Sequence, residues 1–312
     1  MDTRRVSNFI AVVDMGSIAR AAVALHIAQP ALSAQMRQLE EMVGSPLLTR
    51  GAKGVVPTAA GLAFYDKGVD LLRVADGLRM VARDIAEDPE GKVVVGCPTS
   101  VGNMLAAPLV HAVVERHPRI ELGLLESTSA DLGEHLTQGR LDVAVLFADN
   151  LTMGMNHQRV LEEDLFIVGS RPMKEETALS ALHGMALVMP ARPNSVRLLL
   201  EKACAQRGIA PRILAEISSP HTMLQLARSG LGATVLPWST LAAQRMDALY
   251  ASRIVAPRLT RSIALATSAK VPETRRVQVV RDLVRDIMRG LVERSEWQGA
   301  RVGRPARRAK RP

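Results

Sequence analysis

The sequence predicts an α/β protein in three parts: a small helical head at the N-terminus, a long helix, and a larger α/β region. Three observations carry this prediction. Short apolar faces at helical spacing fill residues 3–49, and one long helical pattern runs from Thr58 to about Glu87. From Lys92 onward, apolar runs typical of strands alternate with helical stretches, which favours a parallel sheet with helices on its faces.

The head begins with two short helices. The first is predicted over residues 3–15, and Gly16 ends it, since a helix often closes on a residue without a Cβ atom. Ser17 is a suitable N-cap for the second helix, because its hydroxyl can accept a hydrogen bond from a free backbone N–H. The apolar face of this second helix recurs at helical spacing, at Ile18, Ala21, Ala22 and Leu25.

A third helix is predicted to start at Gln29-Pro30, because proline fits a first turn, where its missing N–H would be unpaired. Its inward face consists of Leu32, Met36 and Leu39. This leaves Gln29, Ser33 and Arg37 on an exposed ridge beside Pro30. Amide, hydroxyl and guanidinium groups suit base edges and phosphates in a major groove. The alternative is an ordinary helical hairpin with a solvated face.

A short hairpin is predicted after the third helix. Leu47-Leu48 and Val55-Val56-Pro57 are apolar and flank a glycine-rich, basic turn. Arg50 and Lys53 in this turn would lie near a phosphate backbone, where positive charge gives affinity without reading sequence. A plain hairpin with solvated ends is the alternative.

The motif AxxLHIAQPALSxQMRQLEExVGxPLLxR resembles the winged helix-turn-helix of the LysR-type transcriptional regulators. The similarity runs from Arg4 to about Gly61, and the family's order of features continues to about Leu291. HIAQPALS, GVVPTAAG and EDLFIVG resemble the branch of the family that contains the nitrogen assimilation control protein. Ala34 departs from the family pattern, which commonly has Arg or Gln there. The resemblance implies DNA contacts from Ser17, Gln29, Pro30, Ser33, Arg37, Arg50 and Lys53.

The long helix carries an apolar stripe that needs a partner. Its first members are Leu62, Tyr65, Val69 and Leu72. An identical helix from a second chain is the simplest partner for such a stripe, so we expect a homodimer or homotetramer. Asp88-Pro89-Glu90-Gly91 then ends the helix as a hinge.

Strands of the α/β region are predicted at Lys92–Pro98, Glu121–Glu126, Leu141–Phe147, Leu165–Gly169, Ala186–Pro190, Ile213–Ile217, Ala233–Pro237 and Arg261–Thr267. A last amphipathic helix is predicted over residues 273–291. The resemblance implies two α/β lobes, as in type 2 periplasmic binding proteins. We expect the chain to cross between the lobes near residues 162–166 and 265–269.

The expected domains are a winged helix-turn-helix over residues 1–58, a linker and dimerisation helix with its hinge over 59–90, a two-lobed effector-binding domain over 91–295, and a basic disordered tail over 296–312. The net charge of +9 is concentrated in that tail. The last fourteen residues carry six Arg/Lys and no acid, whereas residues 1–90 carry ten Lys/Arg against eleven Asp/Glu.

Polar residues follow the predicted strands where a ligand would bind. Ligands of open α/β sheets lie outside the carboxyl ends of the strands, and free N–H groups at helix starts attract anions. The effector pocket of the family lies at matching turns, so we expect a small anion, a carboxylate, between the lobes. The expected contacts are Thr99, Ser100, Thr128, Phe147, Arg192 and Ser195. The alternative for each Ser or Thr is an ordinary N-cap.

Signals of other functions are absent from the sequence. No GxSxG, HExxH, CxxC or GxxxxGK[ST] motif occurs, so no enzyme activity, catalytic residue, cofactor or metal is expected. Cys97 lies beside the expected cleft, where a redox sensor is conceivable, but a small buried residue is the better interpretation.

The location and the partners follow from the same absences and from the resemblance. Without a signal-peptide core or a long apolar stretch, a cytoplasmic protein with no membrane contact is expected. The expected partners are double-stranded DNA of promoter regions, a small-molecule effector and, for an activator, RNA polymerase. The alternatives are a cytoplasmic solute-binding protein and a regulator that acts without a ligand.

Overall fold

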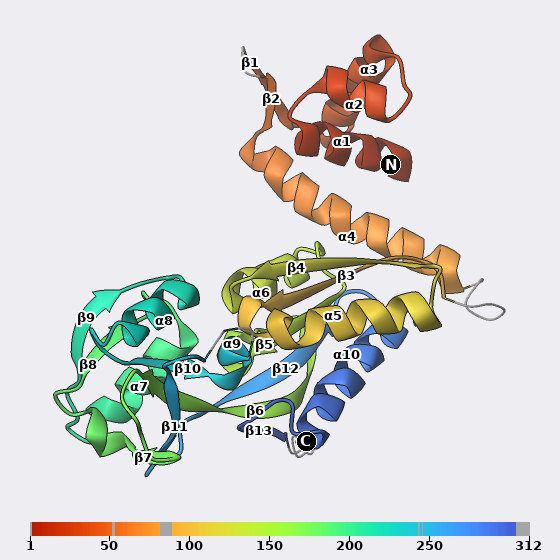
Figure 1. The fold of residues 1–312 in the computed structure, drawn as a ribbon. Helices are drawn as coiled ribbons and strands as arrows, with labels where there is room; N and C mark the ends of the chain where they lie inside the picture. The colour runs from red at the N-terminus through yellow and green to blue at the C-terminus, as the bar shows by residue number, and fades with distance from the viewer. Residues whose placement is uncertain (1, 52–53, 82–88, 243, 245, 304–312) are drawn as a thin grey trace, which may run out of the picture.

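The computed structural model describes residues 2–51, 54–81, 89–242, 244 and 246–303. Figure 1 shows three regions in chain order: the head at the top, the long helix α4 (Ala59–Val81) beneath it, and an α/β domain of two lobes in the lower half. The α/β fold with an N-terminal helix-turn-helix is thus as predicted. No described helix is long and apolar enough to cross a membrane.

The head consists of α1 (Thr3–Met15), α2 (Ile18–Ala24), α3 (Gln29–Val43) and a hairpin of β1 (Leu48–Gly51) and β2 (Gly54–Pro57). Their apolar faces meet in one core, which includes Phe9, Val12, Ile18, Ala21, Leu32, Met36, Leu39 and Leu47. The predicted caps form: the Ser17 hydroxyl accepts the N–H of Arg20, and Gly16 ends α1 in a left-handed conformation.

Part of the apolar stripe on α4 packs against the head of the same chain. The Phe9 and Phe64 ring centroids lie 5.2 Å apart, and the Tyr65 hydroxyl donates a 2.6 Å hydrogen bond to Asp14. Leu62 of the stripe nevertheless remains exposed, and so do Leu71 and Val74, which belong to the same helix but not to the predicted stripe. Residues 82–87, where the predicted helix would continue, lie outside the described residues.

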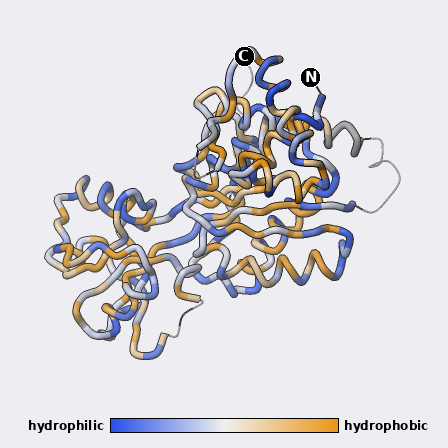
Figure 2. The backbone as a smooth tube through the Cα atoms, turned by 90° about the horizontal axis from the view of Figure 1, so that it is seen from above, coloured by the Kyte–Doolittle hydropathy of each residue, from blue (hydrophilic) through white to orange (hydrophobic). Residues whose placement is uncertain are grey.

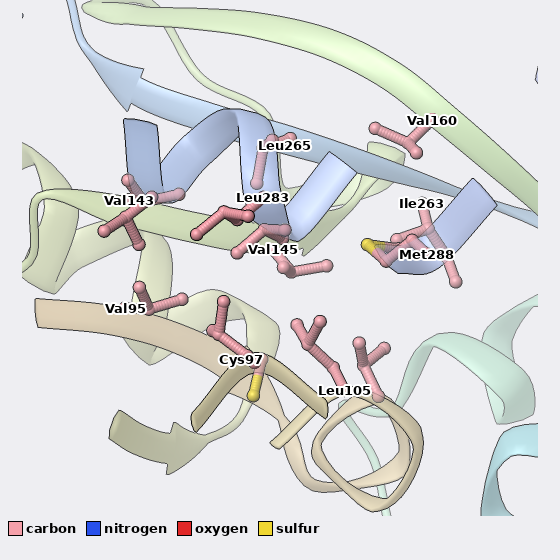
Figure 3. Close-up of a cluster of buried hydrophobic side chains, with 14 of the residues drawn as sticks. Val95, Cys97, Leu105, Val143, Val145, Val160, Ile263, Leu265, Leu283 and Met288 are labelled. Atoms are coloured by element: carbon pink, nitrogen blue, oxygen red, sulfur yellow. The ribbon is translucent and has the colours of Figure 1, made fainter. Parts of the chain in front are cut away.

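Lobe 1 is built on a sheet in the order β4-β3-β5-β12-β6. Its strands are β3 (Gly91–Pro98), β4 (Ile120–Ser127), β5 (Val143–Phe147), β6 (Met155–Gly169) and β12 (Thr260–Ser268). Helices α5 (Thr99–Arg116) and α10 (Arg275–Glu293) cover one face, and α6 (Ser129–Thr137) covers the other. Figure 3 shows the core under α5 and α10, where Leu105 and Met288 meet Val145 and Leu265.

Lobe 2 continues from the second half of β6, which pairs with β10 (Thr234–Pro237) and β11 (Tyr250–Val255). The other strands are β7 (Glu176–Ala178), β8 (Ala186–Met189) and β9 (Arg212–Glu216), with helices α7 (Ser195–Ala205), α8 (Pro220–Arg228) and α9 (Trp238–Leu241). The 3-10 turns η1 (Ala148–Asn150) and η2 (Leu179–Leu182) complete the domain. Figure 2 shows apolar segments running through the middle of both lobes.

The chain crosses between the lobes at two places. The first is within β6, where pairing to β12 ends at Asp164 and pairing to β10 begins at Leu165, inside the predicted range 162–166. The second lies at residues 256–259, between β11 and β12, and the prediction of 265–269 was wrong. By Thr260 the chain has already joined β6 in the lobe 1 sheet. The unpredicted strand β11 hid the junction.

The C-terminus differs from its prediction of disorder from residue 296. Residues 296–303, which we call the C-terminal strap, dock on β6: Trp297 is only 1% exposed, and β13 (Ala300–Val302) pairs antiparallel with residues 161–163. One tryptophan and three strand residues leave no periodic pattern, which is why the sequence did not reveal the strap. Residues 304–312 lie outside the described residues.

The strap is expected to contribute to stability. A chain ending at Ser295 should melt well below the full chain, because loss of a fully buried tryptophan costs roughly 3–5 kcal/mol. At about 2–4 °C per kcal/mol for a domain of this size, Tm should fall by roughly 6–20 °C. A chain ending at Gly303 is the matched control, since it keeps every strap contact described here. Equal Tm values for the two truncations in calorimetry would contradict this assignment.

Candidate DNA-binding face and effector site

The exposed side of α3 carries the residues predicted to contact DNA. Leu32, Met36 and Leu39 are buried, whereas Gln29, Pro30 and Arg37 are exposed and Ser33 is partly exposed. No side chain caps the start of α3, so its first backbone N–H groups are open to a phosphate. Ser17 has a structural task as well, since its hydroxyl caps α2.

The wing hairpin is held in place by one carboxylate and one glycine. Glu40, on α3, accepts the backbone N–H groups of Leu47 and Leu48 at 2.8 and 2.9 Å. At the other strand, a Cβ on Gly54 would lie 2.4 Å from the Gly16 carbonyl oxygen, so only glycine fits this approach.

The two basic residues predicted for the wing are placed only in part. Arg50 lies in β1, its side chain is not described, and Lys53 lies outside the described residues. Sequence reasoning missed Glu40 as the residue that positions the wing. A carboxylate one turn before the end of a recognition helix gives little signal of that role.

Replacing Glu40 with Ala is expected to release the wing and weaken DNA binding on specific and scrambled sites alike. Each charge-assisted hydrogen bond to a backbone N–H is worth about 1.5–3 kcal/mol, so we expect at least a tenfold loss of affinity. The measurement is fluorescence anisotropy with DNA from upstream of the protein's own gene. Glu41→Ala removes the same charge from an exposed neighbour and should not weaken binding. Equal losses in both variants would show that Glu40 does not act through the wing.

A buried arginine lies where the two lobes meet. Arg261, on β12, is 7% exposed, and its Nη2 donates to the Ser100 hydroxyl at 3.0 Å. Its guanidinium carbon lies 3.9 Å from the ring centroid of Phe147, a cation–π contact. The structure therefore brings two predicted effector residues, Ser100 and Phe147, into contact with Arg261, which was not predicted.

Glu163 balances the charge of Arg261. This carboxylate is fully buried on β6, and one oxygen accepts the Arg261 Nε at 2.5 Å, while the other accepts the indole N–H of Trp297 at 3.0 Å. Burial lowers the pKa of the Arg261 guanidinium, and the neighbouring Glu163 opposes that shift. Arg261 is the first residue of the strand predicted at 261–267 and its one charged residue. A charge in a buried strand must be paired, and that was the signal to follow.

Lobe 2 reaches this site through α9. The Ser239 hydroxyl lies 3.5 Å from Arg261 Nη2, and its backbone carbonyl accepts a 3.3 Å hydrogen bond from the Asn103 side chain of lobe 1. The adjacent Trp238 packs against the cores of both lobes. Helix α9 thus joins lobe 2 to the Arg261 site of lobe 1.

The two helix starts that were expected to attract an anion differ. At α5, Thr99 is exposed and no side chain caps the helix. At α6, the Thr128 hydroxyl accepts the N–H of Asp131, and the Ser127 hydroxyl donates to the Asp131 carboxylate at 2.9 Å. Hydrogen bonds from Thr128 and Ser127 lower the pKa of Asp131. A negative charge therefore already occupies the start of α6. The start of α5 has no side-chain cap, but Glu126 lies against its first turn, since a Cβ on Gly102 would be 2.6 Å from the Glu126 carboxylate oxygen.

The lobe 2 residues of the expected site lie on α7 and in the turn before it. The Arg192 guanidinium is paired with Glu201 of α7 at 2.5 Å, and Ser195 is the first residue of that helix. The structure thus gives Arg192 a partner in its own lobe, and Arg261 is the guanidinium where the two lobes meet. Among the described residues, no group of three His, Cys, Asp or Glu side chains could hold a metal ion.

Cys97 lies among the apolar side chains of the lobe 1 core (Figure 3). It is 1% exposed. Burial, with a smaller contribution from Glu126, raises the pKa of its thiol to about 12. A protonated, buried thiol is a poor nucleophile.

Cys97 should therefore resist alkylation by iodoacetamide in the native protein between pH 7 and 8, and react only after unfolding. Mass spectrometry of native and guanidinium-unfolded samples gives the measurement. Cys204 is an internal comparison, since burial raises the pKa of its thiol as well. Rapid modification of native Cys97, or a loss of DNA binding under mild peroxide that Cys97→Ser abolishes, would restore the redox interpretation.

A head with an exposed helix face, joined by a long helix to two α/β lobes, is the architecture of a DNA-binding protein with a ligand-binding domain. Residues 3–62 match the family described as bacterial regulatory helix-turn-helix protein, lysR family, and residues 86–289 match the LysR substrate binding domain. The chain belongs to the LysR family and is a DNA-binding transcriptional regulator with an effector-binding domain. Members of this family are transcriptional regulators and not enzymes.

Individual relatives agree with this assignment. The chain is 32% identical over 303 residues to the nitrogen assimilation regulatory protein nac of Escherichia coli (strain K12), which covers 96% of this chain and 99% of the relative. A full-length OxyR variant from Pseudomonas aeruginosa has a TM-score of 0.78 at 22% identity, over 91% of this chain and 95% of that one. Full-length CbnR complexed with its target DNA has a TM-score of 0.65 at 25% identity, over 92% and 100%.

Proposed function

We propose that this regulator acts in the cytoplasm as a homodimer or homotetramer and that a small carboxylate, bound between the lobes, modulates its activity. The observation that carries the proposal is the uncapped start of α5 beside the Arg261 guanidinium. Thr99, Ser100 and Phe147 line this place, and Thr128 lies at the start of the neighbouring helix.

The chemistry of this place suits a carboxylate. Among the described residues, Arg261 Nη1 donates no hydrogen bond, so one side of the guanidinium is available to a ligand. The free N–H groups of α5 add a favourable interaction of about 0.3–1 kcal/mol with a negative charge, and the Ser100 hydroxyl can donate to an oxygen. Phe147 supplies an apolar wall.

Homo-oligomer formation follows from α4. Leu71 and Val74, three residues apart on one face of this helix, are 36% and 40% exposed. An apolar surface of this kind on a long helix suits an identical partner helix. Two paired heads would place two copies of α3 on DNA of a promoter region, and an activator would also contact RNA polymerase. Ligand binding would bias the angle between the lobes and so the spacing of the heads.

A second candidate function is regulation without a ligand. Glu163 already neutralises Arg261, and the Asn103–Ser239 hydrogen bond already ties lobe 1 to lobe 2. In that case the site is a structural ion pair, and the activity would be set by the amount of protein.

A melting-shift screen separates the two. Acetate, succinate and benzoate are compared with acetamide, succinamide and benzamide, which have similar shapes and no carboxylate. We expect a carboxylate to raise Tm and to change the affinity for DNA. Ser100→Ala should weaken that binding roughly five- to tenfold, the value of about one hydrogen bond.

Ser180→Ala is the matched control, because it removes an exposed hydroxyl from the 3-10 turn η2 of the other lobe. Its carboxylate affinity should equal that of the wild type. Equal shifts with neutral amides, or binding unaffected by Ser100→Ala, would reject the carboxylate site. No shift with any compound would favour regulation without a ligand.

A further inference from the structure

We propose that Trp297, on the C-terminal strap, is a positioning residue of the effector site. Its indole holds Glu163, and Glu163 holds the Arg261 guanidinium against Ser100 and Phe147. The inference rests on the proposed function for what the site binds. The positioning itself is defined by the hydrogen bonds of the protein and can be tested without a ligand.

The hydrogen bonds form a continuous series from the strap to the cleft. The Trp297 indole donates to Glu163 Oε2 at 3.0 Å, and Glu163 Oε1 accepts from Arg261 Nε at 2.5 Å. Arg261 Nη2 then donates to Ser100 at 3.0 Å. Each Glu163 oxygen has one donor, on opposite sides of the carboxylate. Removing the indole N–H therefore frees the carboxylate to rotate, and the guanidinium it orients would rotate with it.

Hydrogen bonds and ion pairs hold the strap in a fixed position on β6. Asp164 donates its backbone N–H to the Gly299 carbonyl at 2.9 Å, and Gly303 donates to the Val160 carbonyl at 2.8 Å. Arg301 pairs with Glu162 at 2.6 Å and with Asp164 at 3.2 Å. These contacts fix the strap to the part of β6 that carries Glu163.

Close packing at Gly299 fixes the strap further. A Cβ at Gly299 would lie 2.7 Å from the Phe166 ring, so the backbone there touches β6 directly. The match to the LysR substrate binding domain ends at residue 289, before the strap. The proposal therefore assigns a role in the ligand site to residues that follow the matched region.

The plainer account is that Trp297 only fills the lobe 1 core, where it packs with residues of α5, α10 and the sheet. Packing alone predicts a loss of stability when the ring is reduced. It predicts no dependence on Ser100, which lies at the far end of the hydrogen-bond series. Both accounts predict that Trp297→Phe lowers stability. Only the positioning role predicts that the stability change depends on Ser100.

The test is a double-mutant cycle on the full chain, read as Tm without ligand. Trp297→Phe keeps most of the ring and removes the N–H, and Ser100→Ala removes the far acceptor. We expect the Tm change of the double variant to differ from the sum of the single changes by at least about 2 °C, since coupled residues do not add. Val302→Ala, on the exposed side of the same strap, should add to Ser100→Ala. Additivity in both cycles would overturn the proposal.

A second measurement covers the case in which Trp297→Phe does not fold. The chain has two tryptophans, so its indole N–H groups give two NMR signals, and Trp238→Phe assigns them. In the otherwise wild-type chain, Ser100→Ala should move the Trp297 signal, whereas Ser180→Ala in lobe 2 should not. If the chemical shift of the Trp297 indole N–H did not change in Ser100→Ala, the proposed series of hydrogen bonds from Trp297 to Ser100 would be wrong.

The ligand readout keeps the two proposals apart. If acetate, succinate or benzoate stabilises the wild type, Trp297→Phe should weaken that binding roughly fivefold or more, and Val302→Ala should not. Coupling without carboxylate binding would uphold the positioning role and reject the carboxylate. Carboxylate binding with full additivity would reject only the role of Trp297.

Discussion

The pairing of β6 with β12 is the constraint on which the rest of the effector domain depends. Both strands lie in the lobe 1 sheet, and β6 then continues into lobe 2, so one strand is common to the two lobes. The buried Glu163–Arg261 pair lies across this ladder. Removing one partner of such a pair leaves an unpaired buried charge and costs roughly 3–5 kcal/mol. The pair therefore fixes side-chain positions at the cleft whether or not it adds net stability.

The head depends on a comparable set of local ties. Glu40 joins α3 to the wing, and the Tyr65–Asp14 hydrogen bond joins α4 to α1. Burial and Asp14 together raise the pKa of Tyr65 to about 12, so this hydrogen bond persists throughout the physiological pH range. Lys270 of the effector domain lies 3.8 Å from Asp70 of α4, so a change in the effector domain can reach α3 through packed elements.

The sequence predicted features that depend on local pattern and missed those that depend on tertiary pairing. Helices α1, α3 and α10 follow from apolar spacing and from caps such as Gly16. Strand β11 and the strap are short and half exposed, so their partners, and not their own residues, make them strands. At the site, Ser100 and Phe147 follow from their place after strands. The role of Arg261 could be predicted only with the knowledge that β12 pairs with β6 and so places Arg261 beside Glu163.

The charges around the start of α5 restrict which anion can bind there. Besides Glu163, the Glu126 carboxylate lies close to this helix, since a Cβ on Gly102 would be 2.6 Å from its oxygen. Arg261 and the partial positive end of α5 must therefore offset two fixed carboxylates before a ligand adds a third. A second negative charge on the ligand would meet these carboxylates at short range. The geometry therefore favours a monoanion with a neutral or apolar remainder, placed against Phe147, over a dianion.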